Sequence, residues 1–175
     1  ILNLYSLQSL LPENNLMIDN EGLWLGKYIP ARYRSLPFVL ASNSNNEDKK
    51  EKILCFVEDF KCVAKNFETE STKIFEKENE LSDEMNKVFE FLQSIEQNEI
   101  LTQNALKSIQ EMNIIEDWSL SLKLKDGEKK MTGLKKIDAD KLRNLSSDNL
   151  EKLNKTGGLD ICFANIFSLN NIEIL

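Results

Sequence analysis

The residues best suited to bind a ligand gather in one segment of the N-terminal third of the sequence. Tyr28, Arg32, Tyr33 and Arg34 fall within seven residues, and Trp24 precedes them. Guanidinium groups bind carboxylates or phosphates through paired hydrogen bonds, while tyrosine and tryptophan rings suit sugars, peptides and partner side chains. These five residues form the candidate site for a ligand or partner.

A purely structural explanation fits the same residues. The two prolines of the segment, Pro30 and Pro37, can shape an extended chain because each lacks an amide donor. The tyrosines can then fill the core, and the arginines can pair with acidic side chains elsewhere in the chain. The sequence alone leaves both explanations open.

The chain has no histidine, which excludes Ser-His-Asp and Cys-His catalysis and histidine-ligated zinc or haem within it. Adjacent acids can in principle perform acid–base chemistry or bind a hard cation. Such pairs occur at Glu58-Asp59, Asp83-Glu84 and Glu116-Asp117, but 29 acidic residues make them expected by chance. We therefore assign no catalytic residue, no metal ligand and no cofactor.

The net charge of −7 arises in the middle of the chain, where residues 41–111 carry 16 acidic and nine basic side chains. An acidic surface repels phosphates, so nucleic-acid binding is not expected. Positive charge is concentrated later in the chain, in a predicted hairpin. This hairpin could contact an acidic surface, including the acidic middle of the same chain, or it could be a strand face exposed to solvent. Its basic residues are Lys123, Lys125, Lys129, Lys130, Lys135 and Lys136.

The three cysteines, Cys55, Cys62 and Cys162, cannot all pair within one chain, and their spacing matches no common metal or redox motif. Cys55 and Cys162 have apolar neighbours, which favours reduced thiols packed in a core. That predicts a reducing compartment, and we expect the cytoplasm. No apolar stretch is long enough to span a membrane, and no signal peptide is recognisable.

The N-terminal half predicts short strands and turns. Residues 1–11 fit either a short helix or a buried strand. Residues 16–18 and 23–25 are expected to pair as strands, because the loop between them has the composition of a hairpin turn.

The next part of the chain predicts further strands and a loop. Residues 28–41 should be extended, either at a sheet edge or between strands, since their prolines cannot donate to a central ladder. Residues 42–52 are polar enough for a surface loop, and residues 53–57 predict another strand. Residues 58–80 permit no assignment.

One long amphipathic helix is the clearest predicted element. Ser82 can cap it, with Asp83 and Glu84 in the first turn, where negative charge is favourable. The apolar spacing changes phase near residues 98–101, which allows a kink or break there. The apolar residues at helical spacing are Met85, Val88, Phe89, Leu92, Ile95, Leu101, Ala105, Leu106, Ile109 and Met112.

The C-terminal third predicts a hairpin and then helices. Residues 118–125 alternate as a half-buried strand, with the turn at Asp126-Gly127 and Met131 opposite Leu122. The helices expected beyond it are 139–144 capped by Asp138, 148–155 capped by Ser147 and ended by Gly157-Gly158, and the buried 159–169.

The fold class expected from this order is α+β, with a mostly antiparallel sheet of hairpins, one long amphipathic helix and a C-terminal cluster of short helices. We expect one domain over residues 1–175.

The order of motifs resembles the SapC family of bacterial proteins. The most specific part is residues 28–38, YIPARYRSLPF, preceded by a matching stretch at residues 15–24. The later matches, in the same order, are Thr102, Lys125-Asp126-Gly127, Gly133-Leu134, Asp138, Leu142, Leu145 and the segment from Gly157 to Ser168-Leu169.

The resemblance covers nearly the whole chain and includes one departure. Family members are usually longer at the N-terminus, so we expect a segment upstream of Ile1. The family often has histidine in the stretch matching residues 163–166, whereas this sequence has Asn165. A histidine base or ligand is thereby excluded here, although asparagine can keep a structural hydrogen bond.

The family is named for its association with the bacterial surface (S-) layer and has no established reaction. The resemblance implies a non-enzymatic accessory protein that engages a protein or a surface-glycan precursor, cytoplasmic or, alternatively, associated with the cell surface. A histidine-free enzyme that positions an anionic substrate with Arg32 and Arg34 is one alternative, and a structural component of the layer is another.

Overall fold

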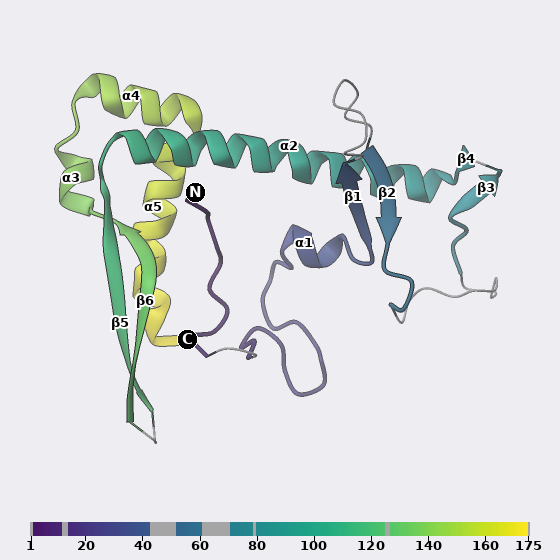
Figure 1. The fold of residues 1–175 in the computed structure, drawn as a ribbon, viewed down its shortest axis with the longest axis horizontal. Helices are drawn as coiled ribbons and strands as arrows, with labels where there is room; N and C mark the ends of the chain where they lie inside the picture. Colours follow the sequence, from purple (N-terminus) through teal and green to yellow (C-terminus); the bar gives the residue numbers. More distant parts are fainter. Residues whose placement is uncertain are drawn as a thin grey trace. The chain divides into compact units, whose positions relative to one another are not determined.

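A computed structural model describes residues 2–11, 14–42, 52–60, 71–78, 80–124 and 127–174. The chain divides into two compact units, of which unit 1 comprises residues 1–21 and 100–175 and unit 2 comprises residues 22–99. Helix α2 (Asp83–Glu111) contributes residues to both units (Figure 1). The single domain expected over residues 1–175 stays a prediction.

The elements confirm the α+β class: in the described part of the chain, every strand belongs to an antiparallel pair of two. Unit 2 contains α1 (Ala31–Arg34), β1 (Phe38–Ser42), β2 (Lys52–Phe56), β3 (Phe75–Lys77) and β4 (Glu80–Leu81). Unit 1 contains β5 (Ile115–Leu124), β6 (Gly127–Ile137), α3 (Ala139–Arg143), α4 (Ser147–Thr156), α5 (Gly158–Ser168) and the 3₁₀ helix η1 (Leu169–Ile174).

Helix α2 begins as predicted. The Ser82 hydroxyl accepts a hydrogen bond from the Met85 amide at 3.3 Å and donates one to the Lys73 carbonyl at 2.7 Å. Ser82 is buried, so the two bonds satisfy a polar group that would otherwise be costly. The helix continues without the break that was allowed near residues 98–101, and the division between the two units falls within that range, after Glu99.

The core of unit 1 lies where α4 and α5 meet, with α5 also packed on β6 (Figure 1). Gly158 permits this close packing, because a Cβ there would lie 2.9 Å from the Ser108 hydroxyl oxygen and 3.0 Å from Cδ2 of Leu153. The buried residues of the core are Leu106, Ile109, Ile114, Ile137, Leu142, Leu153 and Cys162.

The hairpin of β5 and β6 forms with a different register from the predicted one. Leu124 pairs with Gly127, and Met131 pairs with Leu120 rather than Leu122; residues 125–126, where part of the predicted turn falls, lie outside the described residues. An irregularity follows where Trp118 pairs with Leu134. Gly133, at φ +88°, provides the backbone conformation of a bulge there.

Three predictions for the first 42 residues were wrong in whole or in part. Residues 2–11 form neither helix nor strand. Residues 16–18 and 23–25 form no regular strands, although Ile18 and Trp24 are each an isolated β-bridge residue. Side chains bind the local amides instead: Asn15 accepts from Met17, and Asp19 accepts from Glu21, both at 2.9 Å. Residues 28–41 are interrupted by α1, since the fixed φ of Pro30 suits the start of a helix.

The remaining predictions were mostly correct. Strand β2 and helices α3, α4 and α5 lie within one or two residues of their expected bounds. Asp138 caps α3, but the cap of α4 is Ser146 and not Ser147, because Ser146 accepts the Asn149 amide. Gly157 ends α4 in the left-handed conformation. Most of the predicted loop at residues 42–52 lies outside the described residues.

The two described cysteines differ in environment, which predicts different reactivity. Cys162 is fully buried and Cys55 is partly exposed; Cys62 lies outside the described residues. Burial raises the pKa of the Cys162 thiol to about 11, so almost none of it is thiolate at pH 8. We expect iodoacetamide to label Cys162 more than tenfold more slowly than Cys55, measured by mass spectrometry of the peptides. Denaturant should equalise the rates, and equal rates in the folded protein would contradict the buried position.

Candidate functional site

All five predicted site residues lie in unit 2, and four of them contact one another. The Trp24 and Tyr33 rings lie 5.6 Å apart between centroids. The Trp24 indole N–H donates to the Tyr28 carbonyl at 3.0 Å, and the Arg34 guanidinium donates to the Tyr28 hydroxyl at 3.1 Å. The side chains selected from the sequence are therefore linked in one network.

Arg34 is held on several sides. Its Nε donates to the Ile29 carbonyl at 3.0 Å. Its guanidinium carbon lies 5.2 Å from the ring centroid of Tyr28 and 5.0 Å from that of Phe91, which is on α2. These cation–π contacts position Tyr28 and join the segment of α1 to α2. Sequence reasoning missed Phe91, because it lies outside the apolar spacing of the helix.

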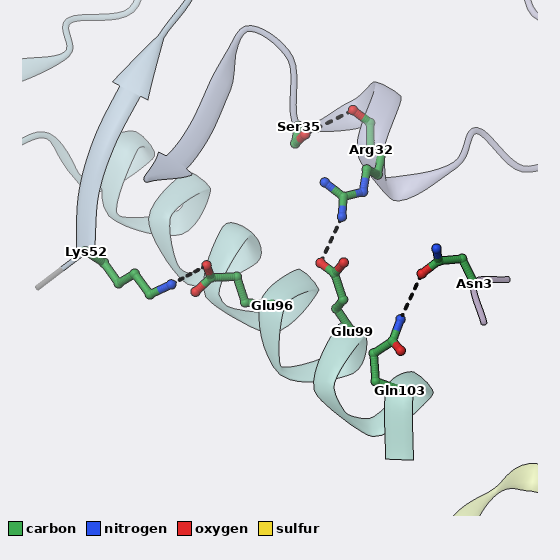
Figure 2. A network of polar contacts seen from close by, with 7 residues as sticks. All are labelled: Asn3, Arg32, Ser35, Lys52, Glu96, Glu99 and Gln103. Atoms are coloured by element: carbon green, nitrogen blue, oxygen red, sulfur yellow. Dashed lines mark hydrogen bonds and ion pairs between the residues drawn. The ribbon is translucent and has the colours of Figure 1, made fainter. Parts of the chain in front are cut away.

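Arg32 has a different partner. Its guanidinium NH2 group lies 2.8 Å from Oε2 of Glu99 on α2, and the two side chains are 74% and 53% exposed (Figure 2). Nearby, Lys52 of β2 pairs with Glu96 of α2 at 2.6 Å. Because Arg32 and Arg34 contact different groups, they do not form a joint anion clamp in this structure.

A small pocket of about 170 Å³ lies beside Arg32 in unit 2. Five of its nine lining residues are aliphatic or aromatic, yet its wall exposes more polar than apolar surface, and the charged groups are those of Arg32, Glu96 and Glu99. Its lining residues are Arg32, Ser35, Phe38, Val39, Leu40, Leu92, Ile95, Glu96 and Glu99. We call this cavity the Arg32 pocket.

The aromatic part of the site is accessible to a partner. Tyr28 is 66% and Tyr33 is 44% exposed, so neither fills the core, contrary to the structural explanation of these residues. Arg32 agrees with that explanation, because it does pair with an acid of the middle segment. The apolar side chains of Leu23, Leu25 and Ile29 in the same segment are also exposed, and exposed apolar groups of this kind suit protein association.

Other charged groups of the sequence have local partners. Within the β5–β6 hairpin, Lys135 pairs with Asp117, and Lys136 pairs with Glu116 at 2.9 Å. Lys135 and Lys136 of the predicted basic hairpin are therefore bound across the strands. Among the described residues, no group of three or more cysteine, aspartate or glutamate side chains is arranged to hold a metal ion. No helix of the described part is long and apolar enough to cross a membrane.

The model of the SapC family matches residues 2–175. The chain belongs to the SapC family. Comparison with curated proteins and with solved structures gave no match. The SapC match includes both compact units, and with them the Arg32 pocket and the segment of Trp24 and Tyr28.

The SapC match also includes Asn165, where the family often has histidine. In this chain Oδ1 of Asn165, on α5, accepts a hydrogen bond from the backbone amide of Ile137 at 2.9 Å. Ile137 is the last residue of β6 and is buried. The structural hydrogen bond that asparagine was expected to keep is therefore present, and it ties the end of the hairpin to α5.

Proposed function

We propose that this SapC family member is a non-enzymatic accessory protein, related to the biogenesis or function of the bacterial surface layer. It engages a protein or surface-glycan partner through the strip Trp24, Tyr28, Arg32, Tyr33 and Arg34. We further propose a cytoplasmic location. The assignment to a surface layer comes from the family, and the choice of binding surface comes from the geometry in unit 2.

The observation that carries the proposal is a pre-positioned, exposed set of aromatic and cationic groups. Arg34 fixes the Tyr28 ring through a hydrogen bond and a cation–π contact, while the ring stays 66% exposed. A side chain that is already ordered loses less conformational entropy on binding. Arg32 adds an accessible guanidinium, and tyrosine and arginine are the side chains enriched at energetically important interface positions.

Affinity capture from the cells that make the protein tests this proposal. The full-length wild type and the Arg32→Ala variant serve as baits, and mass spectrometry identifies retained proteins and glycans. We expect a partner held by the wild type and reduced at least tenfold with Arg32→Ala. Arg32 is the better target than Arg34, because removing Arg34 also removes the contacts that hold Tyr28 and Phe91.

A matched control is available on α3. Arg143 forms an exposed ion pair with Asp140 at 2.9 Å, and its side chain is 75% exposed, close to the 74% of Arg32. Arg143→Ala removes the same charge and should retain the partner. Equal retention by Arg32→Ala and wild type would reject the site. If neither bait specifically retains a protein or glycan, the result counts against a binding role.

A further inference from the structure

We propose that the Arg32 pocket binds a carboxylate joined to a short aliphatic group, and that Glu99 occupies the Arg32 guanidinium until such a ligand displaces it. This inference rests on the proposed function, because Arg32 belongs to the proposed binding strip. It names the ligand chemistry that a protein partner would present: an acidic group next to an aliphatic side chain.

The pocket has a positive charge, on Arg32, that is already placed to bind a carboxylate. Arg32 is the cationic residue of the pocket lining, and its guanidinium already holds one carboxylate, that of Glu99 at 2.8 Å (Figure 2). The main chain behind it is fixed, since the buried Ser35 donates its hydroxyl to the Arg32 carbonyl at 3.0 Å. The geometry that binds Glu99 is the geometry that an external carboxylate needs.

The Arg32 pocket is small, and apolar side chains contribute to its wall. Phe38, Leu92 and Ile95 line the cavity, and Leu92 is buried. A volume of about 170 Å³ holds five or six non-hydrogen atoms at the roughly 30 Å³ that liquid water takes per molecule. An aliphatic side chain of leucine size fits this space.

Displacing Glu99 from Arg32 costs little free energy. The pocket also contains Glu96, but Lys52 neutralises it at 2.6 Å, so Glu99 is the carboxylate that competes for Arg32. Its pair with Arg32 is largely exposed, and exposed ion pairs contribute little. An incoming carboxylate therefore replaces a weak contact with an equivalent one and adds apolar burial. Glu99 acts as an internal competitor that weakens binding of anions without an apolar group.

Short peptides titrated against the full chain and followed by NMR chemical shifts provide the test. The probes are acetyl-Gly-Gly-Leu as the free acid and as the C-terminal amide. We expect the acid to bind wild type at least tenfold more tightly than the amide. Glu99→Gln should tighten binding of the acid by about three- to fivefold, and Arg32→Ala should abolish it. Equal binding of acid and amide would overturn the proposal.

Two matched variants separate the competitor from general charge effects. Glu111→Gln removes a carboxylate of the same helix that is paired with Lys152 at 2.7 Å and lies outside the pocket, and Arg143→Ala removes a guanidinium of similar exposure. Both should leave the affinity for the acid unchanged. If Glu111→Gln tightens binding as much as Glu99→Gln does, or if Glu99→Gln has no effect, Glu99 is not the competitor and the proposal fails.

A third probe identifies the source of the carboxylate. Acetyl-Gly-Leu-Asp-Gly-amide carries an acidic side chain beside leucine and no free C-terminus. Binding of this peptide through Arg32 supports an internal acidic segment of the partner, and binding of the free acid alone supports a protein C-terminus. If cell capture depends on Arg32 while no peptide binds, the proposed function stands and the ligand class falls. If a peptide binds through Arg32 but no partner is captured from cells, the ligand class stands and the proposed function falls.

Discussion

Alanine in place of Leu153 is expected to lower the free energy of unfolding of unit 1 by about 2–5 kcal/mol. Leu153 has no exposed surface and lies in the buried cluster of α4, α5 and their neighbours. The space around its side chain is close-packed, since a Cβ on Gly158 would lie 3.0 Å from Cδ2 of Leu153. Removing three carbon atoms leaves a cavity that this packing cannot fill, so both the transfer free energy and the cavity term are lost.

Denaturant unfolding followed by circular dichroism measures the effect. Leu153→Met keeps the volume and should cost less than about 1.5 kcal/mol. Leu150→Ala, on the same helix but only partly buried, should cost less than Leu153→Ala. A loss below 1 kcal/mol for Leu153→Ala, or a larger loss at Leu150, would show that the core of unit 1 is centred elsewhere.

The elements whose signals are local were predictable from the sequence. The start of α2 needs a cap at Ser82 and the start of α3 needs one at Asp138, and both caps act on amides within three residues. The position of α4 was correct for the same reason, and its cap was displaced by one residue because two adjacent serines offer the same chemistry.

The errors arose where distant or backbone effects decide the structure. The hairpin register differs from the predicted one from the first pair of the hairpin, Leu124 with Gly127, and alternation of apolar residues does not reveal such a difference, because a shift by two residues keeps the same face. The segment around α1 failed for another reason. Proline was taken as a mark of extended chain, whereas Pro30 directly precedes the first turn of a helix.

In the candidate site, too, local contacts were predictable from the sequence and distant contacts were not. Trp24, Tyr28 and Arg34 are close in sequence, so a single segment predicted that they would lie together. Glu99 lies 67 positions from Arg32, and the middle of the chain has 16 acidic residues that could have been its partner. No local pattern selects one of them, and only the tertiary packing of α1 on α2 identified Glu99 and Phe91.

Replacement of Asn165 by leucine should lower the free energy of unfolding by about 1–3 kcal/mol, because it leaves the amide of Ile137 without its acceptor. Ile137 is buried, so water does not readily replace the lost bond. The effect should be local to the junction of β6 and α5. Amide hydrogen exchange at Ile137 and denaturant unfolding measure the two consequences separately.

Asn165→Asp is the matched variant, because aspartate keeps an oxygen acceptor on a side chain of the same length, while its second oxygen replaces the amide NH2 group and adds a negative charge. It should retain the slow exchange of the Ile137 amide that Asn165→Leu loses. If both variants unfold alike and exchange alike, the residue acts by packing and not by accepting a hydrogen bond. If only leucine is destabilising, an acceptor is what this position requires. Neutral imidazole, which has one acceptor nitrogen, meets that requirement too, so a structural role is compatible with the histidine that the family resemblance leads us to expect in this stretch.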